Sequence, residues 1–441
     1  MICMKCFDMA GEGKNDSEPL QSFIPVQNDS DFPIQNLPYG VFQTQGSRPR
    51  IGVAIGEYIL DLSILAKEGY FNGPLLLSNC SCFCEESLNA FMALGRAYWL
   101  EARATVSRLL SASCPTIRDN TDLRSRCLIL QQDAKMLIPA VIGDYTDFYS
   151  SKDHATNVGI MFRGKDNALP PNWLSMPIGY HGRASSVVVS GTDIPRPRGQ
   201  VRPDNAAPPT YAPCRVMDFE LEMGLFIGPG NSLGKPIDVN SAREHIFGLV
   251  LVNDWSARDV QKWEYVPLGP FNAKNFATSI SPWVVTLDAL GDMSVPAPVQ
   301  DPPVPDYLQE NVRRTLSIDL EVLIQGKDME SPAAVTKSNF KYLYWTMEQQ
   351  IAHHTSTGCN LRPGDMLASG TISGPVEESL GCLLELSWQG TREVKLGSSG
   401  QVRKFLQDED CVIMRAHATH PKGYRVGFGE CRGRILPTIQ P

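Results

Sequence analysis

The sequence predicts a mainly β fold with some α-helix, divided into more than one domain. The chain of 441 residues is too long to fold around a single small hydrophobic core, so two domains are the natural expectation. Gly (36) and Pro (33) are abundant, which is typical of a β-rich fold with many turns rather than of a helical bundle. Apolar runs of strand length are more frequent after residue 139 than before it. The second domain should therefore hold most of the strands.

Composition argues against several classes of protein. A hydrophobic content of 42% and a charged content of 20% are those of an ordinary globular protein. The net charge of -8, without any Lys/Arg-rich stripe, argues against nucleic acid as a partner. No apolar run approaches the length of a transmembrane helix, and the first residues are not a convincing signal peptide. We therefore expect a cytoplasmic protein without a membrane partner.

The twelve cysteines do not form a disulfide-like framework, which favours reduced thiols in the cytosol. Cys3 and Cys6 have no second pair at the spacing of a zinc site. Cys80, Cys82 and Cys84 alternate in a loop-like stretch. We interpret both groups as free thiols rather than as metal or redox sites.

The first domain is expected to begin with small β structure after a polar extension. Residues 51–55 and 58–62 read as the two strands of a hairpin around a Gly56-Glu57 turn. Residues 88–110 place apolar side chains on one helical face, which indicates a helix used for packing. The expected divisions are an extension at 1–21, a first domain at 22–138 and a second domain at 139–441.

The second domain opens with a polar cluster at residues 144–149, which read DYTDFY, and His154 follows shortly after it. Asp147 taken alone is more often a turn residue. A single histidine such as His154 is more often a satisfied structural residue than a catalytic one. This cluster is therefore a candidate site only in combination with other stretches.

Residues 217–228, which read MDFELEMGLFIG, predict a strand that is buried on both faces. Glu220 and Glu222 interrupt the apolar run, and residues two apart in a strand point to the same face. Two unpaired anions on a buried element are very costly, so a cation should neutralise them. The alternative is a polar strand face in contact with solvent.

A second buried strand is predicted at 246–252, and Asn253-Asp254 follows it. An acid at the end of a buried strand is well placed to line a site, although Asp254 equally suits a turn cap. Arg258, Gln261 and Lys274 come next, and each can donate to a developing negative charge or simply lie on the surface. Carboxylates without paired Cys or His ligands indicate a hard cation, Mg²⁺ or Ca²⁺.

Residues 316–322 provide an internal comparison for the two glutamates. Leucine, isoleucine and valine alternate there with Ser317, Asp319 and Glu321, which predicts an ordinary half-exposed strand with its acids in water. The flank of Glu220 and Glu222 is apolar at nearly every position instead. This contrast favours a buried site over a solvated face.

Residues 342–354 predict an amphipathic helix with His353 and His354 in its last turn. Adjacent residues on a helix point in different directions. We therefore do not expect these two histidines to form a joint metal site.

Five stretches, taken together and in order, resemble the fumarylacetoacetate hydrolase family. They are residues 147–157, 219–222, 253–259, 263–270 and 368–374, which read DFYSSKDHATN, FELE, NDWSARD, WEYVPLGP and ASGTISG. The likeness runs from about Phe23 to the C-terminus, and the form with an extra N-terminal domain fits best. The resemblance implies an N-terminal SH3-like barrel and a catalytic domain of the mixed β-roll type, paired into a homodimer.

The resemblance also implies an activity. It is the hydrolysis of 4-fumarylacetoacetate, a small diketo acid, to fumarate and acetoacetate, the last step of tyrosine and phenylalanine breakdown. The site residues it implies each carry the family's residue type here. They are Asp147, Glu220, Glu222 and Asp254 for Ca²⁺; Asp254, Lys274 and Thr278 for Mg²⁺; Tyr149, Arg163, Tyr180, Gln261, Tyr265 and Thr371 for substrate; and His154 as general base, oriented by Glu385.

A mechanism follows as a hypothesis. His154 removes a proton from the attacking water, since imidazole titrates near the working pH. Glu385 orients the ring, as the acid of a Ser-His-Asp triad does. An oxyanion hole is formed by Arg258, Gln261 and Lys274. The carboxylate ends of the substrate are held by Arg163, Tyr149 and Tyr180.

Two rival interpretations remain at this stage. One is another metal-dependent member of the same superfamily, such as an acylpyruvate hydrolase, an oxaloacetate decarboxylase or an isomerase. The other is a non-catalytic Ca²⁺-binding protein, which would not need His154, Glu385 and the three donors together.

Overall fold

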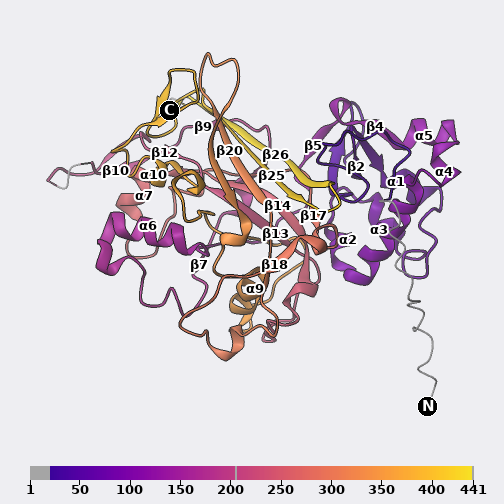
Figure 1. Ribbon diagram of the computed structural model, residues 1–441, viewed down its shortest axis with the longest axis horizontal. Coiled ribbons are helices and arrows are strands. Elements are labelled where there is room, and N and C mark those ends of the chain that lie inside the picture. The colour runs from indigo at the N-terminus through magenta and orange to yellow at the C-terminus, as the bar shows by residue number, and fades with distance from the viewer. Residues whose placement is uncertain (1–19, 204–205, 440–441) are drawn as a thin grey trace.

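The computed structural model describes residues 20–203 and 206–439 (Figure 1). The extension expected at 1–21, apart from its last two residues, and the Cys3/Cys6 pair lie outside these ranges. The described chain forms two bodies that lie side by side, a smaller N-terminal one and a larger C-terminal one built on two sheets. The predicted class, mainly β with some α-helix, is confirmed.

A curled five-stranded antiparallel sheet, in the order β4-β3-β2-β1-β5, forms the N-terminal body. The predicted hairpin is confirmed, because β2 and β3 pair with Ile55 opposite Tyr58. Gly56 occupies the turn with a φ of 53°, a conformation that glycine adopts without strain. The strands are β1 Tyr39–Gln43, β2 Arg50–Ile55, β3 Tyr58–Asp61, β4 Leu128–Leu130 and β5 Lys135–Leu137.

Among the described residues, the N-terminal body also contains five helices. The single helix predicted at 88–110 was wrong in its continuity, because Gly95 has a φ of 90° and separates two helices there. Its apolar face is confirmed: Phe91, Trp99 and Val106 are buried in the core of this body. The helices are α1 Leu62–Lys67, α2 Asn89–Ala93, α3 Arg96–Leu110, α4 Pro115–Arg118 and α5 Thr121–Cys127.

The larger body is centred on a mixed eight-stranded sheet in the order β7-β6-β22-β13-β14-β16-β8, with β17 beside β14. β13 and β14 are buried at every position, which confirms the predicted buried strands. β6 runs parallel to β22, and β16 runs parallel to β8. The strands are β6 Tyr145–Phe148, β7 Gly179–His181, β8 Val187–Val189, β13 Leu221–Ile227, β14 Ile246–Asp254, β16 Thr278–Ile280, β17 Val285–Thr286 and β22 Met366–Ala368.

A second sheet of five strands, in the order β21-β20-β25-β26-β9, covers one face of the first. The comparison strand is confirmed in its alternation, because Leu320 and Val322 are buried, Asp319 is exposed and Glu321 is half-buried. Its continuity over 316–322 was wrong, since one strand ends at Leu316 and the next begins at Asp319. The strands are β9 Ile194–Pro195, β20 Asp319–Gln325, β21 Ala333–Asn339, β25 Cys411–Thr419 and β26 Arg425–Leu436.

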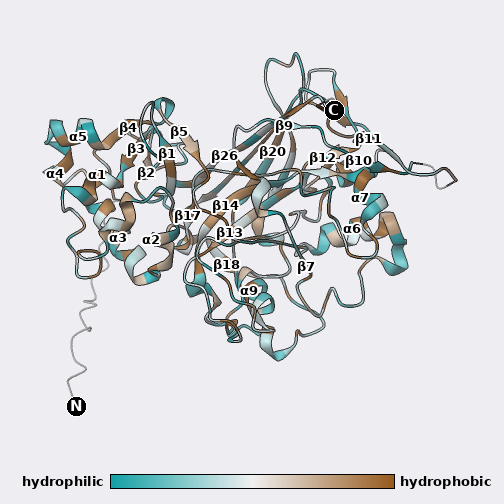
Figure 2. Ribbon diagram, turned by 180° about the vertical axis from the view of Figure 1, so that it is seen from behind, coloured by the Kyte–Doolittle hydropathy of each residue, from teal (hydrophilic) through white to brown (hydrophobic). Residues whose placement is uncertain are grey.

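β13 is buried on both faces because each face meets a different core. Leu221, Met223 and Leu225 pack into the hydrophobic core that also holds apolar side chains of the second sheet. Phe226, on the opposite face, packs with the cluster of the N-terminal body. Hydrophilic residues concentrate on outer helices such as α5 (Figure 2). A strand between two cores reads as a nearly continuous apolar run.

Shorter elements complete the described fold. Two strands form a hairpin that projects from the body, and three further pairs lie in the connections (Figure 1). The strands are β10 Arg198–Val201, β11 Thr210–Pro213, β12 Met217–Asp218, β15 Ser256–Ala257, β18 Ser294–Pro296, β19 Arg314–Leu316, β23 Val394–Lys395 and β24 Val402–Arg403. The helices are α6 Lys152–Arg163, α7 Arg258–Glu264, α8 Leu287–Leu290, α9 Met347–Thr355 and α10 Leu383–Leu386. None of the described helices is long and apolar enough to cross a membrane.

The helix predicted at 342–354 starts later than expected. Thr346 caps α9 through a capping box with Gln349, so the helix begins at residue 347. His353 contacts the hydroxyl of Tyr307 through Nδ1 at 2.9 Å, whereas His354 contacts Thr146 through Nε2 at 2.8 Å. The two rings thus meet different partners, as expected.

Glu310 lies at the start of α9, where Thr346 Oγ1 donates to its Oε2 at 3.0 Å. Burial and then the charge of Glu348 raise the pKa of Glu310 from 4.5 to about 7, although Thr346 and Arg313 oppose the shift. When folding raises the pKa of a carboxyl group, that group contributes most to the stability of the fold at pH values below its pKa in the unfolded chain. That contribution is lost as the pH rises from 4.5 through about 7.

Glu310→Gln should therefore stabilise the protein at pH 8 by about 1–2 kcal/mol, because the neutral amide avoids the cost of ionising a buried acid. The gain should disappear near pH 5, where Glu310 is itself protonated. Denaturant unfolding of the parent and the variant at the two pH values measures the difference. An equal gain at both values would contradict it.

Candidate active site

A pocket in the larger body is lined by most of the residues that the sequence singled out. Its walls come from β6, α6, β7, β13, α7, α10 and the loops after α7 and β22. Three predicted residues, Asp254, Thr278 and Glu385, do not line the pocket and lie directly behind its wall. The predicted residues on its surface are Asp147, Tyr149, His154, Arg163, Tyr180, Glu220, Glu222, Arg258, Gln261, Tyr265, Lys274 and Thr371.

Three carboxylates meet at the wall of this pocket. Asp147, Glu222 and Asp254 each offer an oxygen, and these oxygens all lie within 4.8 Å of one another. The sheet brings them together, because β22 pairs with both β6 and β13 while β13 pairs with β14. All three side chains are buried. Among the described residues, no protein group donates a hydrogen bond to Asp147 Oδ1 or Glu222 Oε1.

The charges of this trio are only partly balanced within the protein, because Lys274 contacts Asp254 but neither Asp147 nor Glu222 among the described residues. Burial, followed by the charges of Asp147, Asp254 and Glu220, raises the pKa of Glu222 well above its usual value. Burial, followed by the charge of Asp254, also raises the pKa of Asp147. Partnerless oxygens of buried carboxylates are the ligands that a hard divalent cation requires. The trio therefore fits such an ion.

Glu220 is placed differently from the trio. The continuous strand predicted at 217–228 was wrong here, because it stops at Asp218 and resumes at Leu221. The break arises because side chains, and not a neighbouring strand's backbone, accept the hydrogen bonds of two backbone N–H groups. Asp218 Oδ1 accepts from Phe219 N, and Asn253 Oδ1 accepts from Glu220 N. Glu220 thus leaves the regular strand.

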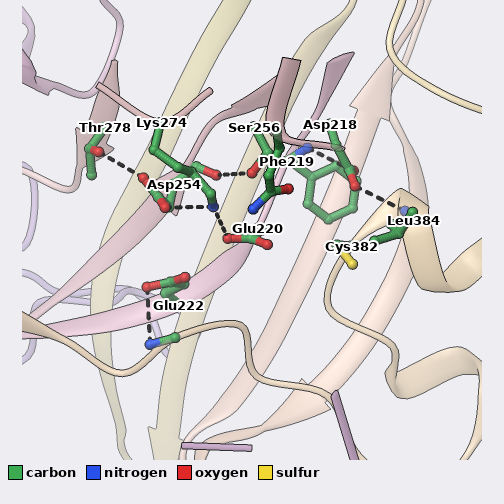
Figure 3. A network of polar contacts seen from close by, with 12 residues as sticks. Asp218, Phe219, Glu220, Glu222, Asp254, Ser256, Lys274, Thr278, Cys382 and Leu384 are labelled. Atoms are coloured by element: carbon green, nitrogen blue, oxygen red, sulfur yellow. Dashed lines mark hydrogen bonds and ion pairs between the residues drawn. The ribbon is translucent and has the colours of Figure 1, made fainter. Parts of the chain in front are cut away.

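Two basic side chains neutralise Glu220. Arg258 Nη1 lies 2.8 Å from Glu220 Oε1, and Lys274 Nζ donates to Glu220 Oε2. Burial would raise the pKa of Glu220, but the charges of Lys274, Arg258 and His154 together hold it below its usual value. Figure 3 shows Glu220 linked to Lys274, while Glu222 lies apart from that network.

Lys274 connects Glu220 with Asp254, whose Oδ2 it approaches at 2.7 Å. Thr278 Oγ1 donates to Asp254 Oδ1 at 2.9 Å, because β16 pairs with the end of β14 (Figure 3). The hydroxyl of Tyr180 donates to Asp254 Oδ2 at 3.1 Å. Asp254 therefore belongs both to the trio and to a neighbouring polar cluster.

His154 and Glu385 form a buried pair at the pocket wall. Ser151 caps α6 by accepting from His154 N, which places the imidazole in the first turn of the helix. His154 Nδ1 lies 2.6 Å from Glu385 Oε2. Burial opposes ionisation of Glu385, yet the charge of His154 and the hydrogen bonds of its neighbours lower the pKa of this carboxyl. The pair has the contacts of a base and its orienting acid.

The three predicted donors converge on the pocket from α7 and the loop after it. Arg258 and Lys274 are buried rather than on the surface, and Gln261 is half-buried. Arg258 Nη1 donates to Gln261 Oε1 at 3.2 Å, and Arg258 Nε donates to Asp218 Oδ2 at 3.0 Å. Asp218 also accepts from the backbone of α10, through Leu384 N at 2.9 Å (Figure 3).

The predicted substrate residues lie at different depths of the pocket. Thr371 is buried, Tyr149 packs edge-on against His154 with ring centroids 5.4 Å apart, and Tyr265 is 47% exposed. Arg163 lies at the exposed end of α6, where its Nη2 donates to Ala168 O at 2.6 Å. The deep residues can contact the reacting atoms, and the outer ones can contact the ends of a ligand.

The sequence interpretation missed Asp218. This fully buried carboxylate joins Arg258 to the helix that carries Glu385. Its signal was present, since Asp218 continues the alternate spacing of Glu220 and Glu222 within the same apolar stretch.

The chain matches two family models. One, described as fumarylacetoacetase N-terminal, covers residues 35–139, and the other, described as fumarylacetoacetate (FAA) hydrolase C-terminal, covers residues 144–436. The fumarylacetoacetase of Bos taurus is 60% identical over 419 residues, which are 95% of this chain and 99% of that protein. The fumarylacetoacetase of Homo sapiens is 59% identical, over 95% of this chain and all of that protein. That of Oryza sativa subsp. japonica is 54% identical, over 96% and 98%.

A solved structure shares the fold. A fumarylacetoacetate hydrolase from Exiguobacterium antarcticum superposes with a TM-score of 0.51, over 91% of this chain and 99% of that chain. At 18% sequence identity this likeness supports the fold alone.

Proposed function

The chain belongs to the fumarylacetoacetase family, and on that basis we propose how it hydrolyses 4-fumarylacetoacetate to fumarate and acetoacetate. The observation that carries the proposal is the buried His154–Glu385 pair, 2.6 Å apart, at the wall of the same pocket as the three clustered carboxylates. This combination provides a base for water beside a site for a cation. The relatives' names supply the substrate.

The proposed cation is Ca²⁺, held by Asp147, Glu222 and Asp254, with Glu220 as the fourth acid. The partnerless oxygens of Asp147 and Glu222 support this assignment. A bound ion of this type polarises carbonyl oxygens and favours an enolate. A second ion, Mg²⁺, is proposed beside Asp254, Lys274 and Thr278.

The protein's own groups carry the proton transfer. We assign His154 as the base that removes a proton from water as its oxygen attacks the substrate carbonyl. Glu385 accepts the hydrogen bond of Nδ1–H, which leaves Nε2 for the water and stabilises the imidazolium that forms. When the carbon–carbon bond breaks, the electron pair leaves with the acetoacetate carbon, and the proton on His154 can return to it.

Negative charge develops on the carbonyl oxygen when water attacks the carbonyl carbon, and hydrogen-bond donors must stabilise it. Arg258, Gln261 and Lys274 are the candidates, since all three line the pocket. Arg258 and Lys274 already contact Glu220, so their positions are fixed before substrate arrives. For the substrate we propose contacts with Gln261 and with Tyr149, Arg163, Tyr180, Tyr265 and Thr371, with Arg163 at a carboxylate end.

Three further properties are proposals. The division near residue 138 is supported by the change from the curled sheet to the mixed sheet after β5. The homodimer and the cytoplasmic location rest on the resemblance and on the cysteine usage, respectively.

The rival within the superfamily, an acylpyruvate hydrolase, decarboxylase or isomerase, is disfavoured by identities of 54–60% with fumarylacetoacetases from animals and a plant. A non-catalytic cation-binding protein has no use for the His154–Glu385 pair.

An assay on the purified full chain tests the function. After removal of metal by a chelator, the loss of fumarylacetoacetate absorbance is followed with no metal, with Ca²⁺ and with Mg²⁺, and an acylpyruvate and oxaloacetate are tested in parallel. We expect rapid loss only with fumarylacetoacetate and only when a divalent cation is restored. Faster turnover of either rival substrate, or no turnover of any, would overturn the proposal.

A further inference from the structure

Two residues of the motifs at 147–157 and 368–374 have no role in the mechanism above. They are Asn157 and Ser373, which are 216 residues apart in the sequence. In the structure both donate hydrogen bonds to one carboxylate, that of Glu385. This convergence connects both motifs to the base rather than to the cation site.

The carboxylate of Glu385 is completely buried. Asn157 Nδ2 donates to Oε1 at 2.9 Å, and Ser373 Oγ donates to Oε2 at 2.7 Å. Cys382 Sγ lies 3.3 Å from Oε2, the oxygen that also contacts His154 Nδ1 at 2.6 Å. The donors thus fix both oxygens and with them the plane of the group.

The donors are themselves held in place. Asn157 lies on α6, one turn after His154, so the histidine and this donor share one rigid element. Ser373 Oγ accepts from Gly381 N at 2.9 Å, which orients its hydroxyl hydrogen towards Glu385. Both ends of the pair are therefore set by the same hydrogen-bond network.

We propose that Asn157 and Ser373 are positioning residues for the reaction: they spread the charge of Glu385 and aim its carboxylate at His154 Nδ1, which leaves the imidazole able to accept a proton from water. The inference rests on the proposed function of His154. It extends that function to two side chains that do not line the pocket.

The physical basis is the sharing of one negative charge. Hydrogen bonds from Asn157 and Ser373 draw charge away from the oxygen that faces the ring, so the carboxylate stabilises the imidazolium less. His154 and Glu385 take up a proton as one unit, and that unit binds it more tightly when a donor is lost. The other ionisable groups that face the pair are Tyr149, Asp153, Glu220 and Cys382.

Ser373→Ala tests the proposal because it removes one donor and leaves the Cβ in place. In the Ca²⁺-loaded full chain, kcat should fall about tenfold with little change in KM. The acid limb of the profile of kcat/KM against pH should move up by about half a unit to one unit. Bound Ca²⁺, measured on the same samples, should match the parent.

Ser379→Ala is the matched control. Ser379 is a buried serine in the same connection, but its hydroxyl donates only to Val376 O, at 2.7 Å, and so caps a turn. Its loss should leave kcat and the pH profile at their parent values. If Ser379→Ala moves the acid limb as far as Ser373→Ala does, loosening of the connection explains the effect and the proposal is overturned.

A double variant separates positioning from general destabilisation. In a Glu385→Gln background, adding Ser373→Ala should change kcat less than twofold, because the charge that Ser373 holds is already gone. Asn157→Leu provides a second variant if Ser373→Ala does not fold, and its acid limb should also move up. If the parent is active and both single variants keep its pH profile, the inference is overturned while the proposed function stands.

Discussion

Replacing His154 by alanine should lower kcat by about 10²–10⁴-fold, the usual contribution of a positioned general base. The fold should persist, because the helix cap that Ser151 provides binds the backbone N–H of residue 154 and alanine keeps it. Bound cation should also persist, since His154 is not one of the three clustered carboxylates. Steady-state kinetics and metal analysis of the same preparation measure both quantities.

His353→Ala is a matched control for this variant. His353 is a half-buried histidine on α9 whose ring meets Tyr307, and it does not line the pocket. Its loss should leave turnover near the parent value. Near-normal turnover in His154→Ala would rule out the base assignment, and loss of the cation together with activity would show that the ring supports the cation site instead.

The buried strands could be predicted because their evidence is local. Residues 221–227 and 246–252 are apolar at nearly every position, and each strand has a hydrophobic core on both of its faces. The half-exposed strand β20 was equally readable from its alternation. The break at residues 219–220 was not, since it depends on the side chains of Asp218 and Asn253, and Asn253 comes from another strand.

The grouping of the acids could not be derived from spacing alone. Asp147 reaches the site because β6 runs parallel to β22, with Asp147 opposite Ala368, and this pairing joins residues 221 apart in the sequence. The resemblance named four acids together. The structure adds that two basic side chains neutralise Glu220 and that none contacts Glu222 among the described residues. That difference leads to a second prediction with a large effect.

Glu222→Gln and Glu220→Gln should have opposite effects on the cation-free protein. Glu222 adds a buried charge beside Asp147 and Asp254, so its neutralisation should stabilise the fold by about 1–3 kcal/mol. Glu220 balances Arg258 and Lys274, so its neutralisation should destabilise the fold by about 2–4 kcal/mol. Denaturant unfolding in the presence of a chelator measures both.

With Ca²⁺ added, Glu222→Gln should be less stable than the parent, whereas without the ion it should be more stable. An ion that binds only the folded state stabilises the parent by mass action, and the variant has lost a charged ligand, so its unfolding midpoint should respond far less to Ca²⁺. Turnover at a fixed low Ca²⁺ concentration should fall by about 10²-fold or more, because the substrate then meets an empty cation site. Calcium titration of the unfolding midpoint and kinetics at several Ca²⁺ concentrations measure these effects.

Glu321→Gln is the control for the loss of one carboxylate. Glu321 is a half-buried acid on β20 that does not line the pocket, and its change should alter neither the response to Ca²⁺ nor turnover. If Glu222→Gln instead destabilises the cation-free protein and retains the parent's response to Ca²⁺, then Glu222 is not a ligand. Its charge would then be balanced within the protein, and the trio could not be the reason that this pocket binds a cation.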